Sequence, residues 1–444
     1  MPRTPNVVVF FTDQQRHDST GLHGNPLDLT PNFDRLARAG THVANSFTCQ
    51  PVCCPARSCM QTGQYATQTG CWKNGIPLRP DAVTLARLFS AAGYDTGYIG
   101  KWHLGDDSVK GAVAPELRGG YDHWLAAQAL EHTSDAYHTR LWDRDNNPVD
   151  LPGYRVDALT DAANRYLAEH ADSSRPFFLF LSFLEPHHQN DIDDYPPPTG
   201  YRERYTARFV PPDLQALVGS APRHLGGYWG MVKRLDEALG RLQDTLESLG
   251  IADDTIVLFT SDHACHFRTR NDEYKRSCHE SSIRVPTAFW GGTFTGGGQV
   301  RQLVSLVDLP ATLLDAAGID IPNTMVGRSI LPLLRREQAA INDWPKDVFV
   351  QISESHVGRA VRTARWKYAV TAPELPGGKH SGSDRYVESF LYDLEADPHE
   401  LHNLVRSRRA DHAAVRAELR ETLVRRMLEA GEPAPTIEPA PAKG

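Results

Sequence analysis

Five nearly continuous apolar runs constrain the fold of this chain more than any other feature. None of them alternates strictly between apolar and polar residues; they occupy residues 6–12, 94–100, 176–183, 255–260 and 285–290. Such runs are typical of a parallel sheet with both faces covered. Helix patterns lie between them, at 31–39, 85–92 and 232–249. Strands that alternate with helices predict an α/β sandwich.

The pattern of apolar and polar residues changes near residue 345. Before it, the pattern predicts one large α/β domain over residues 1–345, with a mainly parallel or mixed sheet between helices. After it, short hairpin-like segments and a final helix pattern predict a smaller α+β domain with an antiparallel sheet over residues 346–430. Residues 431–444 are rich in Pro and Ala and are expected to form a flexible tail.

The charge and the first residues limit the partners of this chain. The 47 basic and 55 acidic residues give a net charge of -8, so we expect neither nucleic acid nor a membrane as partner. The N-terminal residues contain no apolar signal region. As written, the sequence predicts a cytoplasmic protein, or a periplasmic or secreted one if a targeting segment was removed. The oligomeric state stays open.

Polar residues follow four of the five apolar runs at the point where each run ends. In a parallel sheet these groups meet at one edge, where α/β proteins bind ligands. The groups are Asp13, Gln14, Lys101, His103, His187, Asp262 and His263.

Four of these residues are candidate metal ligands. Asp13, Gln14, Asp262 and His263 offer mostly oxygen atoms, which favours Ca²⁺ or Mg²⁺ over zinc. The alternative is that the two aspartates are ordinary turn residues at strand ends.

Five of the seven cysteines crowd residues 49–71, and three of them lie within "PVCCPARSC". Their spacing contains no Cys-x2-Cys pair, which disfavours zinc, and the odd total disfavours a disulfide framework. Buried core positions are expected for Cys49, Cys59, Cys71, Cys265 and Cys278. For Cys53, a reactive thiol activated by nearby basic residues is the alternative.

The stretch Cys53-Cys54-Pro55-Ala56-Arg57, followed by Thr62-Gly63, resembles the type I sulfatase signature Cys-x-Pro-Ser/Ala-Arg-x4-Thr-Gly. "GYIGKWHLG" at 97–105 is similar to the second signature of that family. Further blocks in the family's order lie at 260–263, 275–286, 304–318 and 391–404. The chain is therefore identified as resembling the formylglycine-dependent sulfatases, which belong to the alkaline phosphatase superfamily and share its fold.

The resemblance implies a mechanism and its residues. A separate maturation enzyme would oxidise Cys53 to formylglycine, whose hydrate attacks the sulfur of a sulfate ester. Ca²⁺, ahead of Mg²⁺, would be held by Asp13, Gln14, Asp262, His263 and the modified Cys53. Arg57 would orient the hydrate, and Lys101 and Lys275 would offset the charge of the substrate. His187, with Lys275, would protonate the leaving group, and His103 would act as the base that regenerates the aldehyde.

The sequence departs from the family pattern at two places. Gln14 replaces a second aspartate, and a basic segment follows His263 where a glycine-rich stretch is usual. By analogy with the family, the substrate is expected to be a sulfated carbohydrate. The candidate contacts to the rest of this substrate are Asn74, His266, Arg268 and His279.

Two other functions stay open at this point. Gln14 and Asn74 are compatible with a phosphonate monoester or phosphodiester hydrolase of the same superfamily. The second alternative is a non-catalytic protein that binds sulfated glycans, but such a protein would not need a proton donor.

Overall fold

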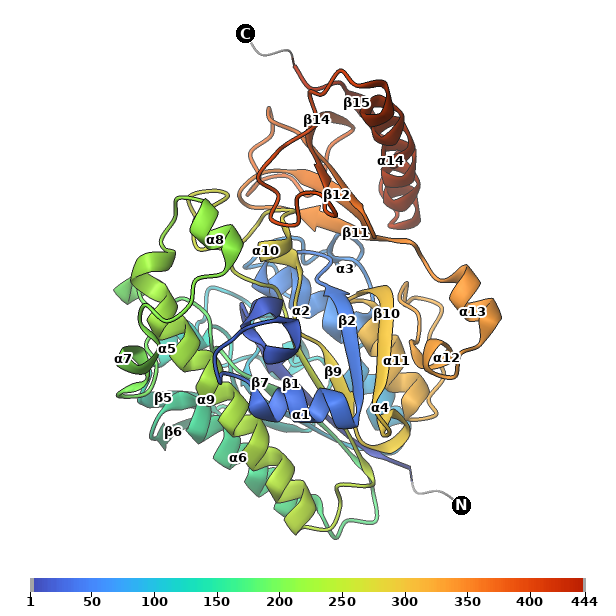
Figure 1. Cartoon of the computed structure of the whole chain (residues 1–444). Coiled ribbons are helices and arrows are strands. Elements are labelled where there is room, and N and C mark those ends of the chain that lie inside the picture. Colours follow the sequence, from blue (N-terminus) through green and yellow to red (C-terminus); the bar gives the residue numbers. More distant parts are fainter. Residues whose placement is uncertain (1–3, 442–444) are drawn as a thin grey trace.

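The computed structural model describes residues 4–441 and contains two sheets (Figure 1). The larger sheet has the strand order β10-β2-β9-β8-β1-β7-β3-β4-β5-β6. Its strands are β1 (Asn6–Thr12), β2 (Thr41–Phe47), β3 (Asp95–Lys101), β4 (His123–Ala127), β5 (His138–Trp142), β6 (Pro148–Pro152), β7 (Phe177–Ser182), β8 (Thr255–Ser261), β9 (Ala288–Trp290) and β10 (Gly298–Ser305).

The centre of this sheet is parallel, and four of the predicted strands form it. β8, β1, β7 and β3 are neighbours in parallel register, and β4 continues the parallel block. Helices α1 (Pro31–Ala39), α6 (Arg155–His170) and α9 (Ala221–Ser248) cover one face. Helices α2 (Cys53–Thr62), α4 (Leu85–Ala91) and α11 (Asp308–Ala316) cover the other. The predicted α/β sandwich is confirmed.

The fifth apolar run differs from the other four. Only Ala288–Trp290 of this run forms a strand, β9, and it pairs antiparallel with both β2 and β8. Pro286 lies inside the run and has no backbone N–H to donate, which disfavours a longer central strand. The sheet is therefore mixed: β9 joins two parallel pairs, and β5 and β6 at the other edge are also antiparallel.

The C-terminal part has its own five-stranded sheet, seen at the top of Figure 1 with helix α14 (Ala410–Glu429) beside it. The strands are β11 (Asp347–Ile352), β12 (Gly358–Thr363), β13 (Trp366–Thr371), β14 (Arg385–Asp393) and β15 (Thr436–Glu438). β15 lies within the segment that was expected to be flexible. It pairs in parallel with β14, because Thr436 and Ile437 are β-branched and meet an open sheet edge.

Buried charges join the two sheets. Lys367 of β13 is fully buried and lies 2.9 Å from Glu280, which begins helix α10 (Glu280–Ile283) in the large unit. Arg362 of β12 contacts the same carboxylate at 3.2 Å. Lys367 also lies 2.6 Å from Glu400, so these ion pairs form a buried network that links α10 to the C-terminal sheet.

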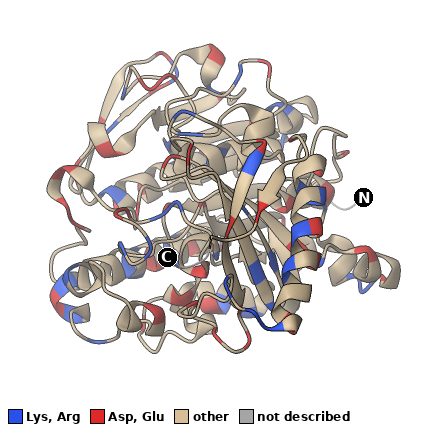
Figure 2. Cartoon of the chain, turned by 90° about the horizontal axis from the view of Figure 1, so that it is seen from above, with Lys and Arg blue, Asp and Glu red and all other residues tan. Residues whose placement is uncertain are grey.

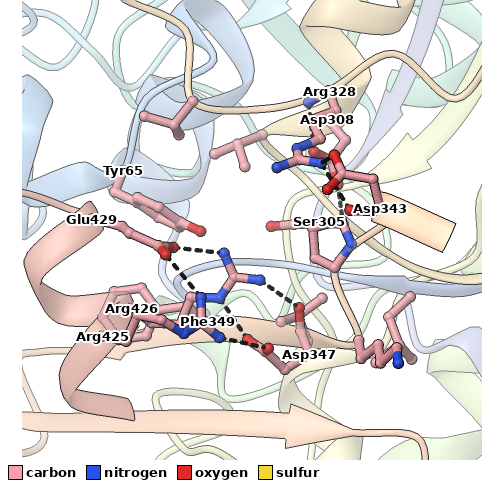
Figure 3. A pocket seen from close by; sticks show the side chains of 16 residues that line it. Tyr65, Ser305, Asp308, Arg328, Asp343, Asp347, Phe349, Arg425, Arg426 and Glu429 are labelled. Carbon is pink, nitrogen blue, oxygen red and sulfur yellow. Dashed lines mark hydrogen bonds and ion pairs between the residues drawn. The ribbon is translucent and has the colours of Figure 1, made fainter. Parts of the chain in front are cut away.

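A cavity of about 510 Å³ lies beside this junction, between β10, β11 and α14 (Figure 3). Asp347 of β11 accepts hydrogen bonds from Arg425 and Arg426 of α14, and both arginines also contact Glu429. The arginines that α14 contributes to this cavity are therefore already paired with carboxylates.

Charged residues of both signs are interspersed along the chain in the view from above (Figure 2). Within residues 4–441, no helix combines the length and the apolar character needed to cross a membrane.

The start of α1 is capped from another helix. The helix begins at Pro31, where the predicted helix pattern begins, and the side chain of the preceding Thr30 makes no capping hydrogen bond within the described residues. Asp236 of α9 instead accepts the backbone N–H groups of Asn32 at 3.1 Å and Phe33 at 2.8 Å.

Replacement of Asp236 with alanine is expected to destabilise the fold by about 2 kcal/mol, because one buried and one half-buried backbone donor lose their acceptor. Chemical denaturation of the variant and of wild type measures this loss. Asp236→Asn keeps one acceptor oxygen and should lose less. Equal stability of Asp236→Ala and wild type would contradict this account of the cap.

Candidate active site

The carboxyl ends of four parallel strands bring the predicted site residues together. Asp13 follows β1, Asp262 follows β8, Lys101 ends β3, and His187 lies five residues beyond β7. β1 pairs with β7 and β8 in parallel, and β7 pairs with β3. The expected convergence at one sheet edge is therefore observed.

Cys53 is the first residue of α2 and is buried at this edge. Its Sγ lies 2.8 Å from Lys275 Nζ, 3.5 Å from His263 Nε2, and 3.8 Å from both Lys101 Nζ and Asp13 Oδ1. The N-terminus of a helix also favours negative charge at this position. Cys53 is thus the point where the basic and acidic groups of the site meet.

The two adjacent cysteines have opposite chemical character. Burial raises the pKa of Cys53, but the charges of Lys101 and Lys275 outweigh it and hold that pKa well below its ordinary value. The hydrogen bond with Cys71 and burial both raise the pKa of Cys54. Only Cys53 is therefore activated.

All seven cysteines are free and buried. The five that were expected in the core lie there: Cys49, Cys59 and Cys71 against the large sheet, Cys265 beneath α9, and Cys278 beside β11 and β12.

A possible metal site lies next to Cys53. One ligand atom each of Asp13, Cys53, Asp262 and His263 lie within 4.8 Å of one another, and all four residues are buried. His263 Nδ1 donates to the carbonyl of Ala264 at 3.0 Å, which leaves its Nε2 lone pair facing the carboxylates. These groups can surround one small cation.

The electrostatics of this cluster fit a cation. Burial and the charge of Asp13 raise the pKa of Asp262 to about 6, and its Oδ2 has no hydrogen-bond partner among the described residues. A bound divalent cation would remove this carboxylate repulsion. Arg57 offsets part of it, with Nη2 at 2.9 Å from Asp13 Oδ2 and 3.5 Å from Asp262 Oδ2.

Gln14 lies at the same edge, with a left-handed backbone. Its side-chain amide oxygen accepts the backbone N–H of His188 at 2.9 Å, and the backbone N–H of Gln14 donates to Asp262 Oδ1. Since a carbonyl oxygen has two lone pairs, one remains for a cation.

His187 and Lys275 form a hydrogen-bonded pair beside Cys53. His187 Nδ1 donates to the carbonyl of His188 at 2.5 Å, so its Nε2 faces Lys275 Nζ at 3.0 Å. Burial and the charge of Lys275 lower the pKa of His187. Burial lowers the pKa of Lys275, but Cys53 and Asp13 outweigh it and raise that pKa. Lys275 therefore holds the proton of the pair.

A cavity of about 550 Å³ opens onto these groups. Cys53, His103, His187 and Lys275 line it, together with the substrate-contact candidates Asn74 and Arg268. The Asn74 side chain accepts the backbone N–H of Cys54 at 3.1 Å, so it also caps α2.

The structure does not place His266 and His279 in this cavity. His266 is fully buried, with Nε2 against the carbonyl of Lys275 at 3.0 Å. His279 packs against Tyr392 in the C-terminal sheet. The sequence of their segment is basic and suggests an exposed loop, but in the structure both histidine side chains are buried. These two imidazoles therefore contribute to packing.

Several residues that line the cavity are not among the sequence-based candidates, and one of them, Glu131, forms an ion pair with a predicted catalytic residue. Glu131 lies 3.2 Å from Lys101 Nζ and follows β4, whose residues were not recognised as a strand. The signal was available, since "HWLAA" precedes it in the same way that apolar runs precede the other site residues.

Comparisons with known proteins identify the family of this chain. The family model described as "Sulfatase" matches residues 5–319, and the model of the N-sulphoglucosamine sulphohydrolase C-terminal region matches 272–429. An ulvan-active sulfatase of Formosa agariphila is 31% identical, over 97% of this chain and 82% of its own length. An N-acetylglucosamine-6-O-sulfatase of Bacteroides thetaiotaomicron is 25% identical, over 95% and 86%.

A solved structure has the same fold. The yidJ sulfatase structure from Bacteroides fragilis superposes with a TM-score of 0.82 at 24% identity, covering 97% of each chain. The fold is that of the alkaline phosphatase-like sulfatases. Because the family model spans most of the chain and the site residues converge as the signatures require, the chain belongs to the sulfatase family and is a sulfuric ester hydrolase.

Proposed function

We propose that this chain hydrolyses a sulfate monoester of a carbohydrate, with formylglycine made from Cys53 as nucleophile and Ca²⁺ as cofactor. The observation that carries the proposal is the position of Cys53 Sγ. It lies between the carboxylate cluster and the two lysines, on the wall of an open polar cavity.

In the proposed reaction, Sγ stands for the hydroxyl groups of the formylglycine hydrate, which supply the attacking oxygen. Arg57 orients this residue through Asp13 and also donates to Ser182 Oγ at 2.6 Å. Lys101 and Lys275 offset the negative charge of the sulfo group. A maturation enzyme of the host would make the modification.

We assign two proton transfers to residues beside Cys53, one to a proton donor and one to a base. Lys275, hydrogen-bonded to His187, supplies the proton that the leaving alkoxide needs, and His187 conducts it. His103 lines the same cavity, and its Nδ1 has no hydrogen-bond partner. It is the base that removes a hydroxyl proton at position 53.

Asp13, Gln14, Asp262 and His263 would hold the Ca²⁺ ion, which would supply positive charge beside the sulfo group. Removal of the metal with a chelator is expected to abolish hydrolysis and to lower the thermal midpoint, because carboxylate repulsion returns. Calcium should restore both properties better than magnesium. Full activity after exhaustive chelation would exclude a metal role.

The carbohydrate part of the proposal is supported by the relatives that act on ulvan and on N-acetylglucosamine-6-sulfate. Asn74 and Arg268 are the proposed contacts to the sugar. The test is sulfate release by the calcium-loaded, modified protein from a panel of sulfated mono- and oligosaccharides, with aryl sulfates and a phosphonate monoester in parallel. No sulfate release from any sugar, with release from the aryl esters, would contradict the carbohydrate substrate.

A further inference from the structure

Glu131 places a second carboxylate beside Lys101, the lysine whose Nζ lies 3.8 Å from Cys53 Sγ. It belongs to the short helix α5 (Leu130–Thr133), directly after β4. Its Oε1 lies 3.2 Å from Lys101 Nζ, and its side chain lines the cavity that contains Cys53. The proposed reaction assigns this residue no step.

Lys101 has another carboxylate partner besides Glu131. Asp13 Oδ2 already accepts a hydrogen bond from Lys101 Nζ at 2.8 Å. With Glu131 on its other side, one ammonium lies between two carboxylates, and all three side chains are almost completely buried. The second carboxylate weakens the attraction of this ammonium for any anion in the cavity.

The free oxygen of Glu131 reinforces this effect. Oε2 is buried and accepts no hydrogen bond from residues 4–441. Burial raises the pKa of Glu131, but the charges of Lys101, His103 and His187 outweigh it and lower that pKa to about 2. The carboxylate is therefore charged whenever the enzyme works.

We propose that Glu131 determines charge specificity: its carboxylate admits anions with one negative charge and rejects anions with two. This inference rests on the proposed function. A sulfate monoester carries one negative charge, whereas the inorganic sulfate released from it carries two. Glu131 would thus favour binding of the substrate and departure of the product, and would disfavour dianionic phosphate monoesters of the same shape.

Two anions of similar size test the proposal. Inorganic sulfate and methanesulfonate differ by one charge, and methanesulfonate has no ester bond to hydrolyse; both are measured as competitive inhibitors of 4-nitrophenyl sulfate hydrolysis and by calorimetry. In Glu131→Gln, which keeps the side-chain shape, inorganic sulfate should gain about tenfold more affinity than methanesulfonate, because one extra unit charge no longer meets a nearby carboxylate.

The control is Asp272→Asn, which removes a carboxylate of the same cavity that has no ion pair with Lys101 among the described contacts. Its affinity ratio for the two anions should equal that of wild type. Thermal midpoints check folding, and Glu131→Ala provides a second variant without the charge.

The outcomes separate the two proposals. If Glu131 only holds Lys101 in place, both anions lose affinity together in Glu131→Gln, and a ratio within about twofold of wild type overturns the inference. If wild-type protein with a modified Cys53 hydrolyses no sulfate ester, the proposed function fails first. Hydrolysis with an unchanged ratio refutes the role of Glu131 alone.

Discussion

Cys53→Ala is expected to lower kcat for sulfate ester hydrolysis by at least roughly 10⁴-fold, the order of loss seen when an enzyme loses its nucleophile. No other group of the cavity can replace it, because only position 53 lies between the carboxylate cluster and the two lysines. Steady-state rates with 4-nitrophenyl sulfate and with a sulfated sugar measure the effect.

The neighbouring cysteine provides a matched control. Cys54 Sγ points to the carbonyl of Ile76 at 3.4 Å, and its pKa is raised, so it is a packed thiol. Cys54→Ala should keep kcat within about threefold of wild type while losing some stability from the small cavity left behind. A large loss of activity in Cys54→Ala, with activity retained in Cys53→Ala, would reverse the assignment of the nucleophile.

His187→Ala is expected to have an effect that depends on the leaving group. With an alkyl or sugar sulfate, kcat should fall by about 10²- to 10⁴-fold, because an alkoxide must be protonated as it leaves. With 4-nitrophenyl sulfate the loss should be much smaller, since nitrophenoxide is stable without a proton. The comparison of the two substrates therefore isolates proton transfer from binding.

His132 serves as the control for this variant. It lines the same cavity but is partly exposed on α5, so His132→Ala should leave both rates within about twofold of wild type. Equal losses on the alkyl and the nitrophenyl ester in His187→Ala would show that His187 positions the substrate and conducts no proton.

The sequence could predict those site residues that follow buried strands. Asp13, Lys101 and Asp262 come at the ends of apolar runs, and parallel pairing of β1, β3, β7 and β8 then places them at one edge. The signature around Cys53 added the proposed nucleophile, which no periodicity indicates. This part of the site depends on local pattern and on one topological rule.

The rest depends on tertiary packing, which a single sequence does not show. His266 and His279 lie in a basic loop that turns inward, so their exposure could not be judged from composition. The helix start at Thr30 was predicted, but the side chain that caps it comes from Asp236, about two hundred residues away. Glu131 was missed because β4 is short and was not recognised as a strand.

The most direct test of the whole account is the mass of the peptide that ends at Arg57, from protein produced with a formylglycine-generating enzyme. The account predicts that the Cys53 side chain has lost its sulfur and become an aldehyde, and that the specific activity of different preparations rises in proportion to the fraction converted. A preparation with unmodified Cys53 that hydrolyses sulfate esters at the full rate would contradict it.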